Sequence, residues 1–297
     1  AQKLGITRAI VFPTPTQIRD IPDGQETNCL WRPDTDVEHR YYIQRNRAGM
    51  MPEVLEQPHL PYQDFNRTTL QFIKHFNEQR NGIRLYLAAK LHPHLDDAHC
   101  LEGLLDNEVV SLKIHGIATH SHPDAFPQWL NEFLRHHDLP IVVHTDWYRG
   151  EENDNLSPHQ RTLLELCRLN NPLNYVRWAI KNKLKVCINH GARLHAESIH
   201  IINNEPNLSL AYGPDSHLDA RQDHLAIPTD DYAASLFEMA RSDKVMFSTD
   251  YRWNIGAENA WDDLRWDSIE RIRRLLAPED QQKVLAQNAI TFYCLKD

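Results

Sequence analysis

The chain has 297 residues, 41% of them hydrophobic and 25% charged, which excludes wholesale disorder and fits one large α/β domain or two ordinary ones. Its 32 basic and 41 acidic residues give a net charge of −9, so it lacks the positive field that binding to nucleic acid or an anionic membrane requires. The five cysteines form no C-x-x-C pair, and no apolar run approaches the roughly 18 residues of a membrane helix. We therefore expect a cytoplasmic protein whose partner is a small-molecule substrate, and the sequence leaves a homodimer open.

Seven short apolar runs, rich in β-branched residues, recur along the chain, and each ends in polar, Gly or Pro residues. They are AIVFP (9–13), RLYLAAKL (84–91), SLKIHG (111–116), PIVVHTD (140–146), KVCINHG (185–191), LSLAYG (208–213) and VMFSTD (245–250). Continuous apolar runs indicate strands that are covered on both faces, as in parallel sheets.

Helical patterns lie between these runs. The predicted helices cover residues 123–137, 157–170, 230–242 and 266–277, with a short closing helix within 278–295. Strands that alternate with helices and show no break in composition predict a TIM-like (β/α)₈ barrel, of which about seven strands are visible. The chain has no G-x-G-x-x-G after its first strand and no phosphate-binding P-loop, so nothing in it indicates a nucleotide cofactor.

Residues 16–70 differ from the rest because they mix Pro, charged and aromatic residues without clear periodicity. We interpret them as an insertion, over the C-terminal rim of the barrel, in a single domain that spans residues 1–297. A surface excursion or an oligomer contact is the alternative interpretation.

Polar residues stand at or near the ends of four predicted strands, where barrel enzymes carry their chemistry. Lys113 and His115 lie on one face of their strand, and His144, His190 and Asp250 each end another. Imidazoles and a carboxylate suit zinc and related cations, which lower the pKa of a bound water, and a carboxylate can move its proton. Each residue alone has an ordinary structural role; their coincidence on separate strands favours a site.

Three further residues are candidates for contact with the substrate. Arg193 follows the strand of His190 and would bind a carboxylate or phosphate in bidentate fashion, although a salt bridge to Glu197 is the alternative. Trp147 follows His144, and Arg252 follows Asp250, so both would line the pocket.

Five pieces of the chain resemble the amidohydrolase superfamily, in particular the amidohydrolase-related branch that includes aminocarboxymuconate-semialdehyde decarboxylase. The pieces are LKIH (112–115), LPIVVHTD (139–146), CINHG (187–191), VMFSTD (245–250) and KVLAQNAITFY (283–293). The resemblance implies a barrel with a divalent metal, zinc first and manganese or iron as alternatives. In it His144 matches a metal ligand, and His190 matches a histidine that is a ligand in some members and a catalytic residue in others.

The resemblance also assigns roles to two other residues. Asp250 matches the aspartate that binds metal and transfers protons. Lys113 falls near a lysine that in some members is carbamylated and in others meets a carboxylate of the substrate.

One feature of the family is missing: its pattern begins with an H-x-H on the first strand, and no H-x-H precedes the first apolar run. The resemblance therefore implies that the first strand of the barrel is absent from the chain as given. Three explanations stay open: a strand with this motif precedes residue 1, the protein has lost it, or another H-x-H replaces it. Two other H-x-H motifs are candidates to replace it, His92-Pro93-His94 and His120-Ser121-His122.

The function expected from these residues is that of a metal-dependent hydrolase acting on a small polar or carboxylated substrate through a metal-activated water. Asp250 and His190 would be the catalytic residues, while Lys113, His115, Arg193, Trp147 and Arg252 would contact the substrate. A non-oxidative decarboxylase of an aromatic or muconate-like acid is one alternative. A non-catalytic barrel subunit without the H-x-H ligands is another.

Overall fold

The computed structural model describes the chain in several stretches, namely residues 6–13, 26–30, 39–45, 53–56, 62–79, 82–94, 96–115, 122–145, 168, 170–213, 229–249 and 258–296. Within them, all seven predicted strands are present and form one parallel sheet. The strands are β1 (Arg8–Val11), β5 (Arg84–Lys90), β6 (Val109–His115), β7 (Ile141–His144), β8 (Val186–Ile188), β9 (Leu208–Tyr212) and β10 (Val245–Phe247).

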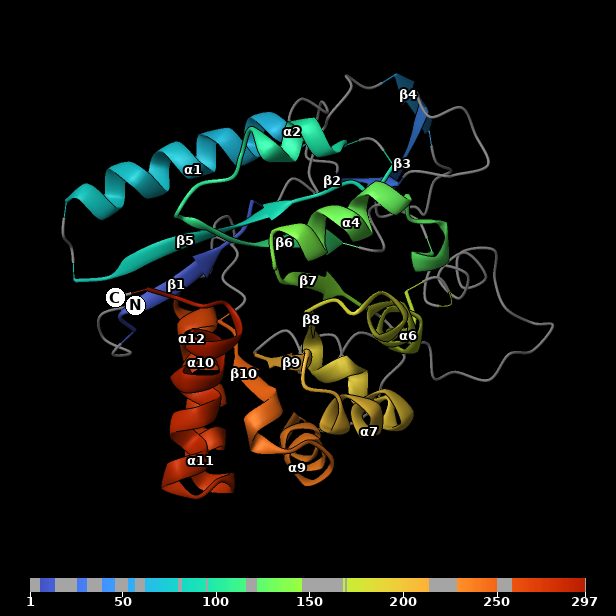
Figure 1. The fold of residues 1–297 in the computed structure, drawn as a ribbon. Helices are drawn as coiled ribbons and strands as arrows, with labels where there is room; N and C mark the ends of the chain where they lie inside the picture. Colours follow the sequence, from blue (N-terminus) through green and yellow to red (C-terminus); the bar gives the residue numbers. More distant parts are fainter. Residues whose placement is uncertain are drawn as a thin grey trace.

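The order of the strands in this sheet is β1-β5-β6-β7-β8-β9-β10. Each strand therefore lies beside the strand of the same sheet that precedes it in the chain. Figure 1 shows the sheet curling, with helices on its outer side. Parallel neighbours joined by helices, in strictly sequential order, are the arrangement of a (β/α) barrel. The predicted fold class is confirmed, with β1 and β10 at the two ends of the sheet in the described part of the chain.

The helices lie between successive strands and after the last one. They are α1 (Gln63–Glu78), α2 (Ala98–Glu102), α4 (Gln128–His136), α6 (Pro172–Asn182), α7 (Ala196–Asn204), α9 (Thr229–Met239), α10 (Glu258–Leu275), α11 (Pro278–Gln282) and α12 (Asn288–Phe292). Short 3₁₀ segments are η2 (Pro123–Ala125), η3 (His190–Leu194) and η4 (Ser242–Lys244), and a π-helical turn, η5 (Lys283–Gln287), joins α11 to α12. None of the described helices is long and apolar enough to cross a membrane.

Two predicted helices differ from the observed ones. The pattern at 123–137 is split, because Phe126 precedes Pro127 and takes an extended conformation, which ends η2 before α4 begins. Helix α10 begins at Glu258, upstream of the predicted start at 266. Most of the helix predicted at 157–170 lies outside the described residues.

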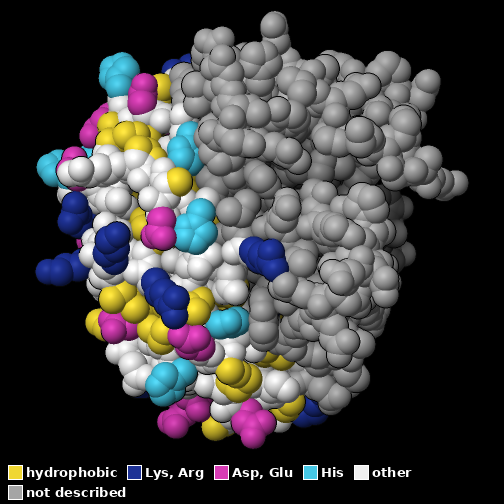
Figure 2. Space-filling model, turned by 90° about the vertical axis from the view of Figure 1, so that its right-hand side faces the viewer, with side chains coloured by type: hydrophobic (Ala, Val, Ile, Leu, Met, Phe, Trp, Pro, Cys, Tyr) yellow, Lys and Arg dark blue, Asp and Glu magenta, His cyan; other side chains and the backbone are white. Residues whose placement is uncertain are grey.

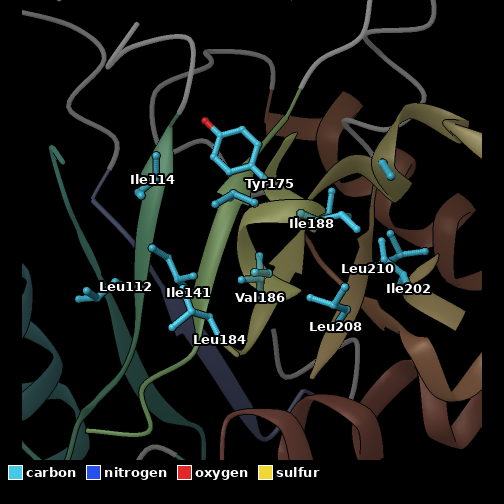
Figure 3. Close-up of a cluster of buried hydrophobic side chains, with 14 of the residues drawn as sticks. Leu112, Ile114, Ile141, Tyr175, Leu184, Val186, Ile188, Ile202, Leu208 and Leu210 are labelled. Carbon is cyan, nitrogen blue, oxygen red and sulfur yellow. The ribbon is translucent and has the colours of Figure 1, made fainter. Parts of the chain in front are cut away.

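The outer face of the sheet carries the main hydrophobic core. In Figure 3, side chains from neighbouring strands lie side by side on this face, among them Leu112, Ile141, Val186 and Leu208. All four are almost fully buried against the helices. The continuous apolar runs predicted strands covered on both faces, and the helices provide the cover of the outer face.

The inner face has a second, smaller core at the amino end of the strands. Val142, Cys187 and Met246, from β7, β8 and β10, pack against Tyr293, which follows α12. The hydroxyl of Tyr86 on β5 also donates a hydrogen bond to the carbonyl of Lys296, at 2.6 Å. The C-terminal segment thus packs into this end of the sheet.

Part of the predicted insertion is regular structure. Strands β2 (Glu26–Leu30), β3 (His39–Arg45) and β4 (Glu53–Glu56) form a separate antiparallel sheet with β3 in the centre, and α1 begins at Gln63, before residue 70. Sequence periodicity did not reveal these strands, because pairing between strands, rather than an alternating pattern, defines such a small sheet. A position over the C-terminal rim stays a prediction.

Candidate metal and substrate site

Two of the predicted site histidines meet at the carboxyl end of the sheet. His144 is the last residue of β7, and His190 follows β8, which pairs with β7 in parallel. Their rings lie edge to face, with centroids 4.5 Å apart, and His190 Nε2 is 2.8 Å from His144 Nδ1. His190 is buried and His144 is half-buried. Two imidazole nitrogens therefore converge at one point on the barrel rim.

His190 begins an unusual backbone segment. All five residues of η3, from His190 to Leu194, have positive φ angles of 50–55°, the left-handed region. Non-glycine residues rarely adopt this conformation, which costs about 1–3 kcal/mol for each of them and clusters at functional sites. Sequence analysis did not find this feature; Gly191 in the CINHG motif is its one local signal, because glycine tolerates positive φ.

Contacts from α9 hold this strained segment in place. The Tyr232 hydroxyl donates a hydrogen bond to the His190 carbonyl at 2.6 Å. A Cβ atom at Gly191 would lie 2.9 Å from Leu236 Cδ2, so α9 packs directly on the glycine. Asn189 N–H also donates to the carbonyl of Val143 on β7, at 3.0 Å. These contacts determine the direction in which His190 leaves the sheet.

Lys113 is also on the inner face of the sheet, and it has a neighbour that sequence analysis missed. The Cα of Lys113 on β6 pairs with Lys90 on β5 and with Val142 on β7. Both lysines are only 2% exposed. Spacing by two along LYLAAK places Lys90 on the face of Tyr86 and Ala88, and this alternation is the signal that could have identified it.

His115 lies two residues beyond Lys113, where its Cα pairs with that of His144. The register therefore gives two successive rows of the sheet, one with Lys90 and Lys113, and one nearer the carboxyl end with His115 and His144. The direction of the His115 side chain is outside the described part of the structure.

Arg193 is the third residue of the left-handed segment and is almost completely buried, with 1% of its surface exposed. The alternative salt bridge to Glu197 is not observed, because the Glu197 carboxylate lies at the surface and accepts a hydrogen bond from Arg177 at 3.1 Å. The Arg193 side chain is therefore buried within the segment that begins at His190.

The strand that leads to Asp250 is held closely to its neighbour. Ser248 N–H donates to the carbonyl of Tyr212 at 2.7 Å, which extends the pairing of β9 and β10. A Cβ atom at Gly213 would lie 2.2 Å from the Ser248 carbonyl oxygen, so only glycine fits there. Asp250 itself, like Trp147 and Arg252, lies outside the described residues.

In the described residues, histidines of the alternative H-x-H motifs accept hydrogen bonds from nearby backbone N–H groups. His92 Nδ1 accepts a hydrogen bond from the backbone of His94 at 3.3 Å, and the two rings are 6.3 Å apart. His122 Nδ1 accepts from Asp124 N–H at 3.1 Å and so caps η2. His120 lies outside the described residues. Within the described ranges, no group of three or more His, Cys, Asp or Glu side chains is arranged to hold a metal.

Other histidines have local roles at the surface or at helix ends. His137 lies 2.9 Å from the carboxylate of Glu102, and His75 lies 2.9 Å from the side chain of Gln79. His195 Nδ1 accepts from Ser198 N–H and caps α7. Figure 2 shows histidines scattered among charged side chains of both signs over the described part of one face. Position, rather than abundance, therefore distinguishes His144 and His190.

Cys187 is unsuited to nucleophilic chemistry. It is fully buried in the inner core, and burial raises the pKa of its thiol to about 12. The thiolate that would attack a substrate is therefore scarce at neutral pH.

Comparison with solved structures supports the fold. A candidate 2-pyrone-4,6-dicarboxylic acid hydrolase from Pseudomonas putida is 13% identical, with a TM-score of 0.52 and coverage of 77% of each chain. The protein ATU3138 of Agrobacterium tumefaciens, in its apo form, is 10% identical, with a TM-score of 0.52 and coverage of 98% of this chain and 96% of that one. These identities are low, so the likeness concerns the fold.

A third solved structure, described as an amidohydrolase II, is 13% identical, with a TM-score of 0.50 and coverage of 81% and 82%. No curated protein matches the chain. The family model described as amidohydrolase matches residues 1–295, almost the entire sequence. The chain therefore belongs to the amidohydrolase family.

Proposed function

We propose that this protein is a metal-dependent hydrolase that acts on a small polar or carboxylated substrate at the carboxyl end of its barrel. The observation that carries the proposal is the 2.8 Å approach of His190 Nε2 to His144 Nδ1, from adjacent strands, in a chain of the amidohydrolase family. The left-handed backbone at His190 supports it, because strain of this kind is kept mainly where function requires it.

The residues present are suited to a divalent cation. Imidazole nitrogens are preferred ligands of zinc and related metals, and these two converge from neighbouring strands. His144 and His190 would hold the cation, with Asp250 as a further ligand; zinc is the first expectation, and manganese or iron are alternatives. When bound, such a cation lowers the pKa of a water molecule and polarises a carbonyl group.

The side chains around the two histidines have distinct roles in this proposal. Asp250 removes a proton from the attacking water, and His190 stabilises or protonates the oxygen on which negative charge develops. Arg193 and Lys113 hold an acidic group of the substrate, and both are buried, which strengthens such contacts. Trp147, Arg252 and His115 are proposed to line the same pocket.

The first experiment measures metal content. We expect about one equivalent of a divalent metal or more per chain by elemental analysis of the intact protein. His144→Ala should retain less than about a tenth of it, because removal of a direct ligand costs more than the 10–100-fold known for outer contacts. His75→Ala, which changes an exposed histidine on α1, is the matched control and should keep the metal. An intact protein without metal, unchanged by His144→Ala, would favour a non-catalytic barrel.

The second experiment separates hydrolysis from decarboxylation. For any substrate that the protein turns over, a hydrolase transfers oxygen from ¹⁸O-labelled water into the product, and Asp250→Asn abolishes turnover. A decarboxylase releases CO₂ and incorporates no labelled oxygen. Release of CO₂ in the absence of label would replace the hydrolase proposal by the decarboxylase.

A further inference from the structure

We propose that the buried hydroxyl of Thr145 is a binding group of the active site and donates a hydrogen bond to an acceptor oxygen of the bound ligand. The oxygen belongs to a carboxylate or to an amide carbonyl, which present it in the same trigonal geometry. The inference rests on the proposed function only in that the carboxyl end of the barrel is taken as the active site. It adds a residue that determines which ligands this end accepts.

Thr145 follows His144, the last residue of β7, and none of its surface is exposed. Its Oγ1 atom is buried as well, and the described part of the chain supplies no hydrogen-bond partner for it. A hydroxyl can donate one hydrogen bond and accept two, so within the described residues this capacity is unused. Most buried polar side-chain atoms have at least one partner, which makes Thr145 an exception that requires an explanation.

Two other buried hydroxyl groups near the same sheet are paired. Ser111 Oγ on β6 donates to the carbonyl of Pro140 at 3.0 Å. The Tyr232 hydroxyl on α9 donates to the carbonyl of His190 at 2.6 Å. The fold therefore satisfies hydroxyl groups that have a structural role, and Thr145 is not satisfied in this way.

A threonine at this position costs stability unless its hydroxyl is paired. Removing a hydroxyl from water without a compensating hydrogen bond is unfavourable, whereas valine has almost the same shape and carries no such cost. The strand before it already contains Val142 and Val143, so packing alone would favour valine at position 145 too. Residues that lower stability without a structural gain are expected at functional sites.

The pairing of β7 with β8 places Thr145 at the rim, next to the two histidines. Asn189 N–H donates to the carbonyl of Val143 at 3.0 Å, so the strands stay paired up to the residue before His144. Because β7 ends at His144, the alternation of side chains along a strand does not direct Thr145 to the outer face. Consecutive Cα atoms are about 3.8 Å apart, so a ligand in contact with His144 has the Thr145 hydroxyl within reach of its next few atoms.

A buried hydroxyl discriminates between ligands through the cost of leaving it unpaired. A ligand with an acceptor oxygen completes the hydrogen bond and removes that cost. An apolar ligand of the same size leaves the hydroxyl unpaired and binds more weakly. Thr145 thereby selects oxygen-bearing ligands, in agreement with a small polar or carboxylated substrate.

The first test measures thermal unfolding of the full chain without ligand. Thr145→Val should raise Tm by about 2 °C or more, because it removes an unpaired buried hydroxyl and keeps the shape. Thr69→Val makes the same change on α1, where the hydroxyl donates to the Phe65 carbonyl at 2.7 Å, and should not raise Tm. A lower or unchanged Tm in Thr145→Val would overturn the proposal, since a buried water or a group of the protein would then already pair with the hydroxyl.

The second test uses benzoate and benzamide as probes, which present the acceptor oxygen with and without a negative charge. We expect at least one of them to raise the Tm of the wild type with increasing concentration, and the tighter-binding probe identifies the charge of the ligand. Thr145→Val should weaken that binding about threefold or more, the contribution of one hydrogen bond. Equal binding by Thr145→Val and the wild type would overturn the proposal, as would a wild type that neither probe stabilises.

Thr145→Ser separates the hydroxyl from the shape of the side chain. It keeps the hydroxyl and loses a methyl group, so it should bind the same probe within about twofold of the wild type. A loss of binding in Thr145→Ser as large as in Thr145→Val would show that shape, and not the hydrogen bond, determines affinity, and would overturn the proposal.

Metal content distinguishes this proposal from the metal-dependent function. Thr145→Val should have the metal content of the wild type, whether that is one equivalent or none, because the hydroxyl is not proposed as a ligand. An intact protein without metal would overturn the proposed function alone, since probe binding is measured without turnover. Loss of metal in Thr145→Val, with probe binding unchanged, would show that the hydroxyl acts through His144 and would overturn its role in binding the ligand.

Discussion

The inner face of the barrel has two ends with opposite character. At the amino end, Tyr293 packs against Val142, Cys187 and Met246, and the C-terminal segment closes the space. At the carboxyl end, β7 ends in the half-buried His144 and β8 leads to the buried His190, while Lys113, the register partner of Val142, lies between the two ends. One set of strands therefore supports a closed apolar core and a polar site only a few residues apart.

The difference separates an apolar region that stabilises the fold from the polar end where we propose the active site. Apolar burial stabilises the fold, whereas each buried polar or charged group costs free energy unless it is paired. The carboxyl end also contains the left-handed segment that begins at His190. In the described residues, the histidine pair and the left-handed segment thus lie at one end of the strands, apart from Tyr293 and its apolar contacts.

The largest expected effect on stability comes from removal of the aromatic ring at the amino end. Tyr293→Ala should lower the free energy of unfolding by about 3–5 kcal/mol, because it leaves a cavity among Val142, Cys187 and Met246. Urea unfolding measures the loss, and metal content should be unchanged in the folded protein.

Tyr293→Phe is the matched control, since it keeps the ring and removes only the hydroxyl that bonds to Cys187. It should cost no more than about 1.5 kcal/mol. A loss of metal in Tyr293→Ala that remains folded would contradict the separation of the two ends.

A smaller effect is expected at the left-handed segment. Gly191→Ala introduces a Cβ at φ +55°, 2.9 Å from Leu236 Cδ2, so it should lower the free energy of unfolding by about 1–3 kcal/mol. Because His190 is the adjacent residue, metal content should fall as well.

Gly103→Ala, the same substitution at a glycine with negative φ, is the control for Gly191→Ala. Gly103 has φ −67°, and a Cβ there meets no atom closer than 3.6 Å, so stability should change by less than about 1 kcal/mol. Normal stability and full metal content in Gly191→Ala would show that the left-handed backbone does not position His190.

The smallest effect concerns the pH dependence of stability at the carboxyl end. Burial lowers the pKa of His94 below its usual 6.5. As pH falls from 6.5 towards the lower folded pKa, the unfolded chain takes up a proton that the folded chain does not, so the free energy of unfolding decreases. His94→Gln should reduce this slope by up to about 1.4 kcal/mol per pH unit.

Denaturant unfolding of the wild type and of His94→Gln between pH 5 and 7 measures the two slopes. An unchanged slope in His94→Gln would show that another group dominates the acid sensitivity of this end.

Much of the fold was predictable because it depends on local patterns. Seven apolar runs gave seven strands in the predicted order, since a strand covered on both faces must be apolar along its length. The split at Phe126–Pro127 and the small sheet of β2–β4 were not predicted, because the first depends on one proline and the second on pairing between strands.

The sequence alone determined the strands, their alternation with helices and the place of His144 and His190 at strand ends, because these are properties of neighbouring residues. Only the tertiary structure decided that the two rings touch, that His190 enters a left-handed segment under α9, and that Lys90 lies beside Lys113. Each of these depends on register or packing between segments far apart in the chain. Contacts of that kind are selected by the whole core, so no local pattern encodes them.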